Sequence, residues 1–94
     1  MIKTIRHKGL RLLWEQGNTS KLPADLVTRI GIMLEVIDSA NEVPQDFEAF
    51  KNWHPHQLAG EYKDFRSLKV NKNYRIIFRF DGQHAYNLDY IDYH

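Results

Sequence analysis

The fold is decided by residues 67–80, which read SLKVNKNYRIIFRF. Leu68 and Val70 alternate with polar neighbours, and after residues 71–73 the side chains alternate again. A period of two predicts β-strands, and the tight connection at 71–73 predicts an antiparallel pair. In the second strand one predicted face is apolar and turned to the core, with Tyr74, Ile76, Phe78 and Phe80. The other face is partly basic, with Arg75, Ile77 and Arg79.

A third strand is predicted towards the C-terminus. Asp81-Gly82 is a strong hairpin signal, because glycine readily adopts the positive φ angles of two-residue turns. Tyr86, Leu88 and Tyr90 continue the alternation beyond it. The three consecutive strands are therefore expected to form an antiparallel meander.

The N-terminal half shows helical periodicity instead. Residues 2–5 are expected to form a short opening strand, followed by a first helix that ends near Gly17. A main helix is predicted over residues 23–40, because Pro23 suits a first helical turn. Residues 41–60 lose the periodicity, apart from one short helical turn expected within 45–50. The apolar stripe of the main helix consists of Leu26, Val27, Ile30, Met33, Leu34 and Ile37.

These elements predict an α+β fold in the order βααβββ, with two N-terminal helices packed on a mainly antiparallel sheet of about four strands. The length of 94 residues suits a single domain spanning 1–94. The absence of cysteine excludes disulfides and thiolate metal ligands. Neither a secretory signal nor a membrane-spanning run is present, so a cytoplasmic protein without a membrane partner is expected.

The net charge of +1 hides an uneven distribution. Residues 1–21 hold five Lys or Arg against Glu15, whereas residues 22–62 hold seven acids against two basic residues. Residues 63–79 are again basic, with Asp64 as their single acid. This segment is the one expected to meet phosphates, through Lys63, Arg66, Lys69, Lys72, Arg75 and Arg79.

Two clusters carry side chains suited to RNA cleavage, Trp53-His54-Pro55-His56 and the terminal Asp92-Tyr93-His94. When a ribose 2′-hydroxyl attacks the adjacent phosphate, the protein need not supply the nucleophile. It must accept one proton, donate another and stabilise negative charge. Histidines with one or two Arg or Lys residues suffice for this, without metal or cofactor.

Ordinary structural roles compete with this interpretation. A loop histidine before proline is commonly a solvated surface residue, and a terminal histidine commonly frays. Arg75 and Arg79 equally suit a solvated sheet face. His7, His56 and His84 are interpreted as non-catalytic, and no pair of histidines has the spacing of a helical metal site.

Taken together, the motifs resemble the HigB-type toxins of the RelE/ParE superfamily, which belong to type II toxin–antitoxin systems. The resemblance covers essentially the whole chain, and its most specific parts are residues 70–76 and the terminal Asp-Tyr-His. The matching segments are residues 2–10, 12–17, 22–23, 40–42, 54–55, 67–71, 73–76 and 89–94.

The resemblance implies the RelE fold and a ribosome-dependent endoribonuclease that cleaves mRNA in the ribosomal A site and inhibits translation. By analogy His54 and His94 handle protons, Asp92 supports the site, Tyr93 positions or stacks on the nucleotide, and Arg75 stabilises the phosphate. Lys63, Lys69, Lys72 and Arg79 are the expected RNA-binding residues. No cofactor or metal is implied.

One departure concerns a Leu-Lys-Gly tripeptide that the family often carries after the histidine, where this chain has Leu58-Ala59-Gly60. The segment between His54 and Ser67 is also about two residues longer than the family pattern. Either Lys63 supplies the missing charge from a shifted position, or Arg75 and Lys69 suffice.

The resemblance also implies partners. These are the ribosome with its 16S rRNA, mRNA, and a HigA-like helix-turn-helix antitoxin, through whose complex alone operator DNA is contacted. Two other functions fit the same fold: inhibition of DNA gyrase by binding, as in ParE toxins, and non-catalytic nucleic-acid binding. His54 with the terminal Asp92-Tyr93-His94 favours the nuclease, because a binding inhibitor has no need of proton-transfer groups.

Overall fold

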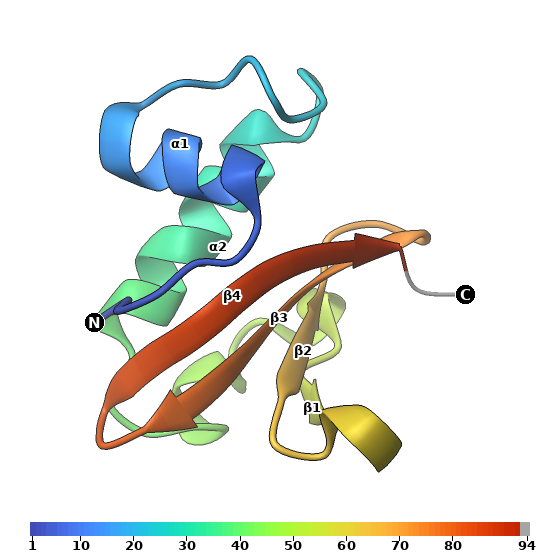
Figure 1. The fold of residues 1–94 in the computed structure, drawn as a ribbon. Helices are drawn as coiled ribbons and strands as arrows, with labels where there is room; N and C mark the ends of the chain where they lie inside the picture. The colour runs from blue at the N-terminus through green and yellow to red at the C-terminus, as the bar shows by residue number, and fades with distance from the viewer. Residues whose placement is uncertain (93–94) are drawn as a thin grey trace.

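The computed structural model describes residues 1–92 and confirms the predicted α+β class. Helices come first and an antiparallel sheet follows (Figure 1). In the part of the chain that the structure describes, no helix is long and apolar enough to cross a membrane. The elements are α1 (Lys8–Gln16), α2 (Val27–Ser39), η1 (Gln45–Phe47), η2 (Lys51–Trp53), β1 (His56–Gln57), η3 (Gly60–Tyr62), β2 (Arg66–Lys69), β3 (Tyr74–Asp81) and β4 (His84–Asp92).

The sheet has the strand order β1-β2-β3-β4, and every neighbouring pair is antiparallel. The expected opening strand at residues 2–5 is wrong in detail, because this segment makes isolated parallel bridges to β4 instead of a continuous ladder. Between these bridges the hydroxyl of Thr4, not a backbone carbonyl, accepts the N–H of Asn87 at 2.8 Å. The fourth strand is β1, which lies in the segment predicted to be irregular.

A β-bulge in β4 corrects the predicted alternation. Asn87 has a φ of +57°, and the β3–β4 register shifts between Ile77 and Arg79. An extra residue in one strand reverses the faces beyond it. Ala85 therefore lies in the core, while Tyr86 pairs with Arg79 on the opposite face instead of continuing the side of Leu88 and Tyr90.

The helix ends follow from local hydrogen bonding. In α1 the His7 side chain accepts the N–H of Leu10, and Gly17 ends the helix with a left-handed φ of +67°. The main helix α2 begins at Val27, four residues after the predicted start. Pro23 opens a separate turn instead, closed by the Leu26 N–H bonding to its carbonyl at 3.0 Å.

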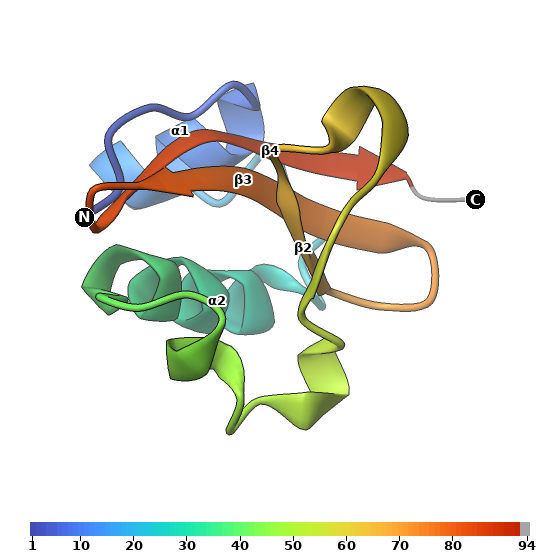
Figure 2. The ribbon, with the colours of Figure 1, turned by 90° about the horizontal axis from the view of Figure 1, so that it is seen from below.

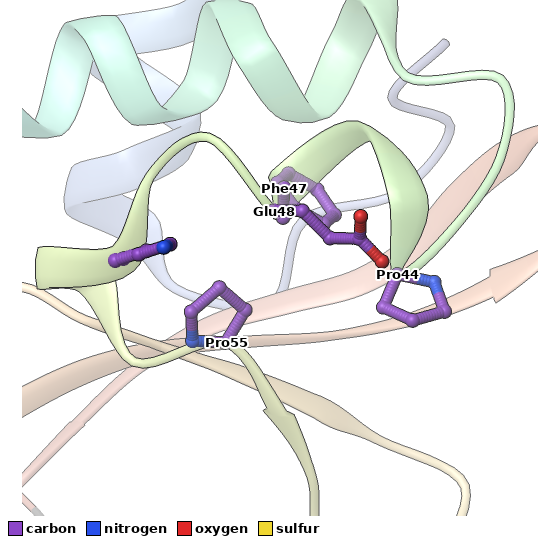
Figure 3. A pocket seen from close by; sticks show the side chains of 5 residues that line it. Pro44, Phe47, Glu48 and Pro55 are labelled. Carbon is purple, nitrogen blue, oxygen red and sulfur yellow. The ribbon is translucent and has the colours of Figure 1, made fainter.

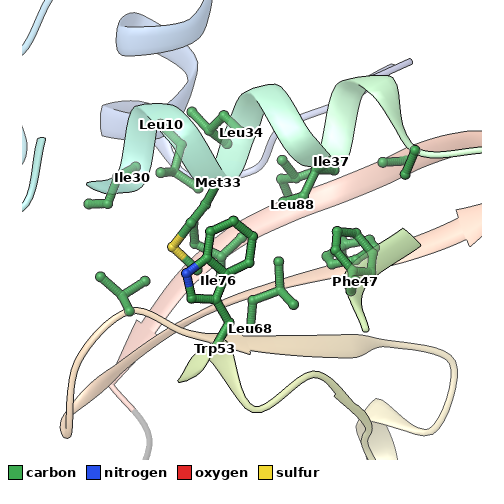
Figure 4. Packing of buried hydrophobic residues seen from close by; sticks show 14 of the residues in the cluster. Leu10, Ile30, Met33, Leu34, Ile37, Phe47, Trp53, Leu68, Ile76 and Leu88 are labelled. Atoms are coloured by element: carbon green, nitrogen blue, oxygen red, sulfur yellow. The ribbon is translucent and has the colours of Figure 1, made fainter. Parts of the chain in front are cut away.

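The core lies between α2 and one face of the sheet (Figures 2 and 4). Figure 4 shows the side chains of α2 meeting those of the strands, while Trp53 and Phe47 enter from η2 and η1. Each such fully buried apolar side chain contributes about 1.5–3 kcal/mol by leaving water. The fully buried members include Ile30, Met33, Leu34, Ile37, Leu68, Ile76, Phe78 and Leu88.

The face of the sheet turned away from α2 is here called the outer face. Its side chains form cross-strand rows, one of Lys69, Arg75 and Ile91 and the next of Ser67, Ile77 and Asp89. Ile77 and Ser67 are fully buried although they lie outside the main core cluster. The outer face, predicted from the sequence to be partly basic, is therefore also partly covered.

Candidate functional site at the hairpin end of the sheet

His54 lies at the end of η2 in a left-handed conformation, with φ +46° and ψ +55°. Its N–H donates to the Lys51 carbonyl at 3.1 Å, and its own carbonyl accepts from His56 Nδ1 at 2.9 Å. The preceding Trp53 is only 6% exposed and belongs to the core cluster. Anchored on both sides, the exposed His54 is presented to solvent in a defined position.

The strand registers gather the predicted residues at one end of the sheet, here called the hairpin end: the β2–β3 turn at residues 70–73 with the adjacent strand termini. Lys69 pairs with Arg75, and Tyr74 pairs with Asp92. Because β1 runs antiparallel to β2 with His56 opposite Ser67, the residues before His56 lead towards Lys69. His54, Lys69, Arg75 and Asp92 therefore share this end.

These residues occupy both sides of the sheet. Lys69 and Arg75 lie on the outer face, whereas the register of Asp92 with Tyr74 assigns Asp92 to the side of the core. Tyr93 and His94 lie outside the described residues. The candidate site is thus a rim around the end of the sheet, with cationic groups on one side and Asp92 on the other.

The side chain of Arg75 is held in place by a hydrogen bond to a buried residue of β2. Its Nη1 donates to the Ser67 hydroxyl at 3.2 Å, and Ser67 is completely buried. Lys69 and Ile91 flank it in the same cross-strand row. A half-buried guanidinium held in this way presents a pre-organised positive charge, as an anionic transition state requires.

The β2–β3 turn that carries Lys72 is also held firmly. The Asn71 side chain accepts the N–H groups of Asn73 at 2.9 Å and Tyr74 at 2.8 Å. From α2, Arg29 donates to the Val70 carbonyl at 2.6 Å. Lys72 is exposed at this turn, so the structure places it with Lys69 and Arg75.

The other two predicted RNA-binding residues lie at the opposite end. Lys63 follows η3, before β2 begins, so the four-residue length of β2, roughly 13 Å, separates it from Lys69. Arg79 lies with its guanidinium 5.9 Å from the Tyr86 ring centre, beside a hollow also lined by Asp64 and Asp81. The structure therefore does not bring Lys63 or Arg79 together with Arg75.

Sequence reasoning missed Arg6. Its N–H donates to the Leu88 carbonyl of β4 at 2.7 Å, yet its guanidinium lies 5.5 Å from the ring centre of Phe65, just before β2. Because β3 lies between β4 and β2, the Arg6 side chain crosses the outer face. The basic excess of residues 1–21 was the available signal, but it did not single out Arg6.

Other surface features have a different character. Among residues 1–92 no cluster of three or more His, Cys, Asp or Glu side chains could hold a metal ion. A shallow pocket of about 420 Å³ lies between η1 and η2, and Figure 3 shows Pro44, Phe47 and Pro55 around it, with Glu48 at its edge. This mostly apolar lining offers no proton-transfer chemistry.

Two pKa shifts have clear physical causes. Backbone N–H groups of Glu42 and Asn41 donate to Asp46 and lower the pKa of its carboxyl group. Burial raises the pKa of the Tyr90 hydroxyl, and Tyr74 and Asp25 raise it further. Asp46 caps a loop far along the chain from the hairpin end, whereas Tyr90 lies two residues from Asp92.

The comparisons with known proteins agree with the resemblance in the sequence. A family model described as HigB-like toxin, the RelE-like toxin HigB of type II toxin–antitoxin systems, matches residues 3–94. The chain belongs to the HigB-like toxins. The toxin is 44% identical over 94 residues to Endoribonuclease HigB of Proteus vulgaris, and the match covers the whole of both chains. It is therefore a homologue of an endoribonuclease.

A solved structure shows the same fold for this HigB-like toxin. The crystal structure of YafQ from E. coli strain BL21(DE3) aligns with a TM-score of 0.59 and 14% identity, covering 98% of this chain and 91% of YafQ. The solution structure of HP0894 from Helicobacter pylori aligns with a TM-score of 0.49 and 12% identity, covering 96% and 94%. At 14% identity, the likeness to YafQ shows the fold alone.

Proposed function

We propose that this HigB-like toxin is a ribosome-dependent endoribonuclease that cleaves mRNA in the ribosomal A site and thereby inhibits translation. The observation that carries the proposal is the convergence of His54, Lys69, Arg75 and Asp92 at the hairpin end. The 44% identity to an endoribonuclease supports the same activity. Action on ribosomes assigns the toxin to the cytoplasm.

In the proposed reaction the ribose 2′-hydroxyl attacks the adjacent phosphate. The new P–O bond forms as the bond to the 5′-oxygen of the next nucleotide breaks, which leaves a cyclic phosphate and a free 5′-hydroxyl. One histidine of the pair His54 and His94 accepts the 2′-hydroxyl proton and the other protonates the leaving oxygen. Asp92 orients the acid–base group, Tyr93 stacks on the nucleotide, and Arg75 stabilises the negative charge on phosphorus.

The remaining cations divide by position. Lys69 and Lys72 share the hairpin end with Arg75 and are proposed to hold the phosphates next to the cleaved bond. Lys63 and Arg79 lie at the far end and contact RNA only peripherally. Because Lys63 is remote, Arg75 and Lys69 are the residues that compensate for Ala59, where the family often has lysine.

We further propose that a HigA-like helix-turn-helix antitoxin neutralises the toxin. The family belongs to type II toxin–antitoxin systems, which supports a cognate protein partner. The ribosome, with its 16S rRNA, and mRNA are the other partners. Operator DNA is contacted through the antitoxin complex.

The test is cleavage of mRNA on programmed ribosomes by the purified toxin with its native C-terminus, mapped by primer extension. Cuts in the A-site codon are expected for the native protein. They should disappear in His54→Ala and His94→Ala, while co-sedimentation shows that ribosome binding persists. His84→Ala is the matched control, because this histidine lies at the far end of β4.

Absence of cuts with the native protein, under conditions where another ribosome-dependent toxin cleaves, contradicts the proposal and directs attention to gyrase inhibition. Cuts that persist in both histidine variants preserve ribosome-dependent cleavage but refute the assignment of proton transfer.

A further inference from the structure

The end of β4 is held by an aromatic cluster on the core side of the sheet. Tyr74 and Tyr90 stack in parallel, with ring centres 4.8 Å apart and an interplanar angle of 2°. Tyr90 pairs with Ile76 and Tyr74 pairs with Asp92, so the two tyrosines are diagonal neighbours across β3 and β4. Such diagonal aromatic pairs stabilise the strand pairing where they occur.

A third ring closes the cluster from α1. The His7 ring meets Tyr90 edge-on, with centres 5.5 Å apart. His7 is itself immobilised, because its Nδ1 accepts the N–H of Leu10 at 3.2 Å as the cap of α1. The N–H groups of Arg6 and His7 both reach the Leu88 carbonyl, at 2.7 and 3.4 Å. Tyr90 is thus clamped between β3 and the start of α1.

The clamp lies immediately before Asp92. Tyr90 is the last aromatic side chain of β4 within the described residues, and Asp92 follows two positions later on the same side of the strand. A strand terminus without such packing frays and loses the orientation of its side chains. The rings therefore fix the direction in which β4 presents Asp92.

We propose that Tyr90, clamped between Tyr74 and His7, is a positioning residue that aims Asp92 for the proposed cleavage. The inference rests on the proposed function, since it assigns Asp92 a part in that reaction. The packing of the ring performs the role, and the hydroxyl does not. Within residues 1–92 the Tyr90 hydroxyl oxygen is buried without a hydrogen-bond partner, so phenylalanine should replace tyrosine without loss.

The experiment measures kcat and KM for mRNA cleavage on programmed ribosomes in Tyr90→Ala, Tyr90→Phe and Asp92→Asn, and in the double variant Tyr90→Ala/Asp92→Asn. Tyr90→Ala should lower kcat by about 10- to 100-fold with KM for the ribosome unchanged, because misplacement of a catalytic group by about 1 Å has an effect of this size. Tyr90→Phe should retain native kcat. In the Asp92→Asn background, Tyr90→Ala should change kcat by less than about twofold.

Phe80→Ala is the control for simple destabilisation. Phe80 is also a half-buried aromatic residue packed against the core, but it lies at the far end of β3. The Phe80→Ala variant should have a lower melting temperature than the native protein and the same kcat. Tyr74→Ala is the second variant should Tyr90→Ala not fold, and it should reproduce the loss of kcat.

The outcomes separate this proposal from the proposed function. If the native protein cleaves but Tyr90→Ala retains native kcat, or if its effect multiplies with that of Asp92→Asn, Tyr90 does not position Asp92. An equal loss of kcat in Phe80→Ala also overturns the proposal, because the effect is then one of general stability. No cleavage by the native protein refutes the proposed function itself.

Discussion

Arg75 and Arg79 lie on the same strand and the same face, yet they lie at opposite ends of the sheet. Arg75 is held by the buried Ser67 hydroxyl in a row with Lys69, near His54 and Asp92. Arg79 stacks on Tyr86 and borders a hollow shared with Asp64 and Asp81. One arginine thus strengthens a cationic site, and the other is offset by neighbouring acids.

The difference teaches that the number of charges in a segment does not define a nucleic-acid site. Residues 63–79 carry six basic side chains along the sequence, but the registers distribute them between the two ends. The fold also brings Arg6 from a distant segment to Phe65, at the end remote from Arg75. Pairing register, not local composition, decides which cations act together.

The largest expected effect is the contrast between Arg75→Ala and Arg79→Ala. Arg75→Ala should lower single-turnover cleavage on programmed ribosomes by about 10²- to 10³-fold, as does removal of one oxyanion donor. Arg79→Ala should lower it by less than about tenfold, because Arg79 lies at the far end beside Asp64 and Asp81, where a peripheral phosphate contact contributes about 1 kcal/mol or less. Equal losses in both variants would show that the two ends are not functionally distinct.

A substitution at Gly9 should disturb the packing at the start of α1, which contacts the hairpin end through His7 and Tyr90. A Cβ there would lie 2.9 Å from Cε1 of His7 and 3.0 Å from the Lys21 carbonyl oxygen. Gly9→Ala should therefore destabilise the fold by about 1–3 kcal/mol in urea unfolding.

Gly31 provides the matched control, because a Cβ at this position of α2 meets nothing within 4 Å. Gly31→Ala should stabilise the fold by about 0.5–1 kcal/mol, since glycine is unfavourable inside a helix. A Gly9→Ala variant as stable as the native protein would show that α1 adapts freely around His7.

A smaller effect is expected for Arg6, which the fold brings onto the outer face. Binding of the inactive His54→Ala toxin to programmed ribosomes should weaken with salt. Adding Arg6→Ala should reduce the slope of log affinity against log salt by less than about 0.7–0.9, the value for one full phosphate contact, because the Arg6 guanidinium lies over Phe65 at the far end. Arg11→Ala on α1 should leave the slope unchanged, and an identical slope in both would remove Arg6 from the RNA contact surface.

The smallest expected effect concerns Tyr90→Phe. At neutral pH this variant should be as stable as the native protein or slightly more so, because it removes a buried hydroxyl that lacks a partner in the described residues. The pKa of Tyr90 is raised in the folded state, so the unfolded chain ionises first as the pH rises.

Native stability should therefore fall relative to Tyr90→Phe above about pH 10, the ordinary tyrosine pKa, and the difference should level off above the folded pKa. Urea unfolding from pH 8 to 11 measures it. A constant difference over this range would show that Tyr90 is not buried as described.

Much of the fold followed from local patterns. The alternation in residues 67–80, the Asp81-Gly82 turn and the apolar stripe of α2 predicted the meander and its helical cover correctly. Two of the errors arose around Asn87. The Thr4 hydroxyl accepts the Asn87 N–H between the two bridges made by residues 2–5. The bulge at Asn87 places Tyr86 on the other face of the sheet. Neither feature leaves a periodic pattern in the sequence from which it could be predicted.

The site was predictable in residue type and less so in arrangement. His54 and Asp92 were identified by chemistry, and the register then placed them at the same end. Lys63 and Arg79 were selected because they belong to a basic segment, and the structure separates them from Arg75. The aromatic clamp at Tyr90 joins α1, β3 and β4, so only tertiary packing reveals it.

The most direct test of the central claim is photo-crosslinking of His54→Ala toxin to ribosomes carrying 4-thiouridine in the A-site codon, with the crosslinked peptides identified by mass spectrometry. Crosslinks should fall at the hairpin end, near position 54, in residues 69–75 and at Asp92. Crosslinks confined to residues 63–65 and 79–86 would place the RNA at the far end and contradict the account.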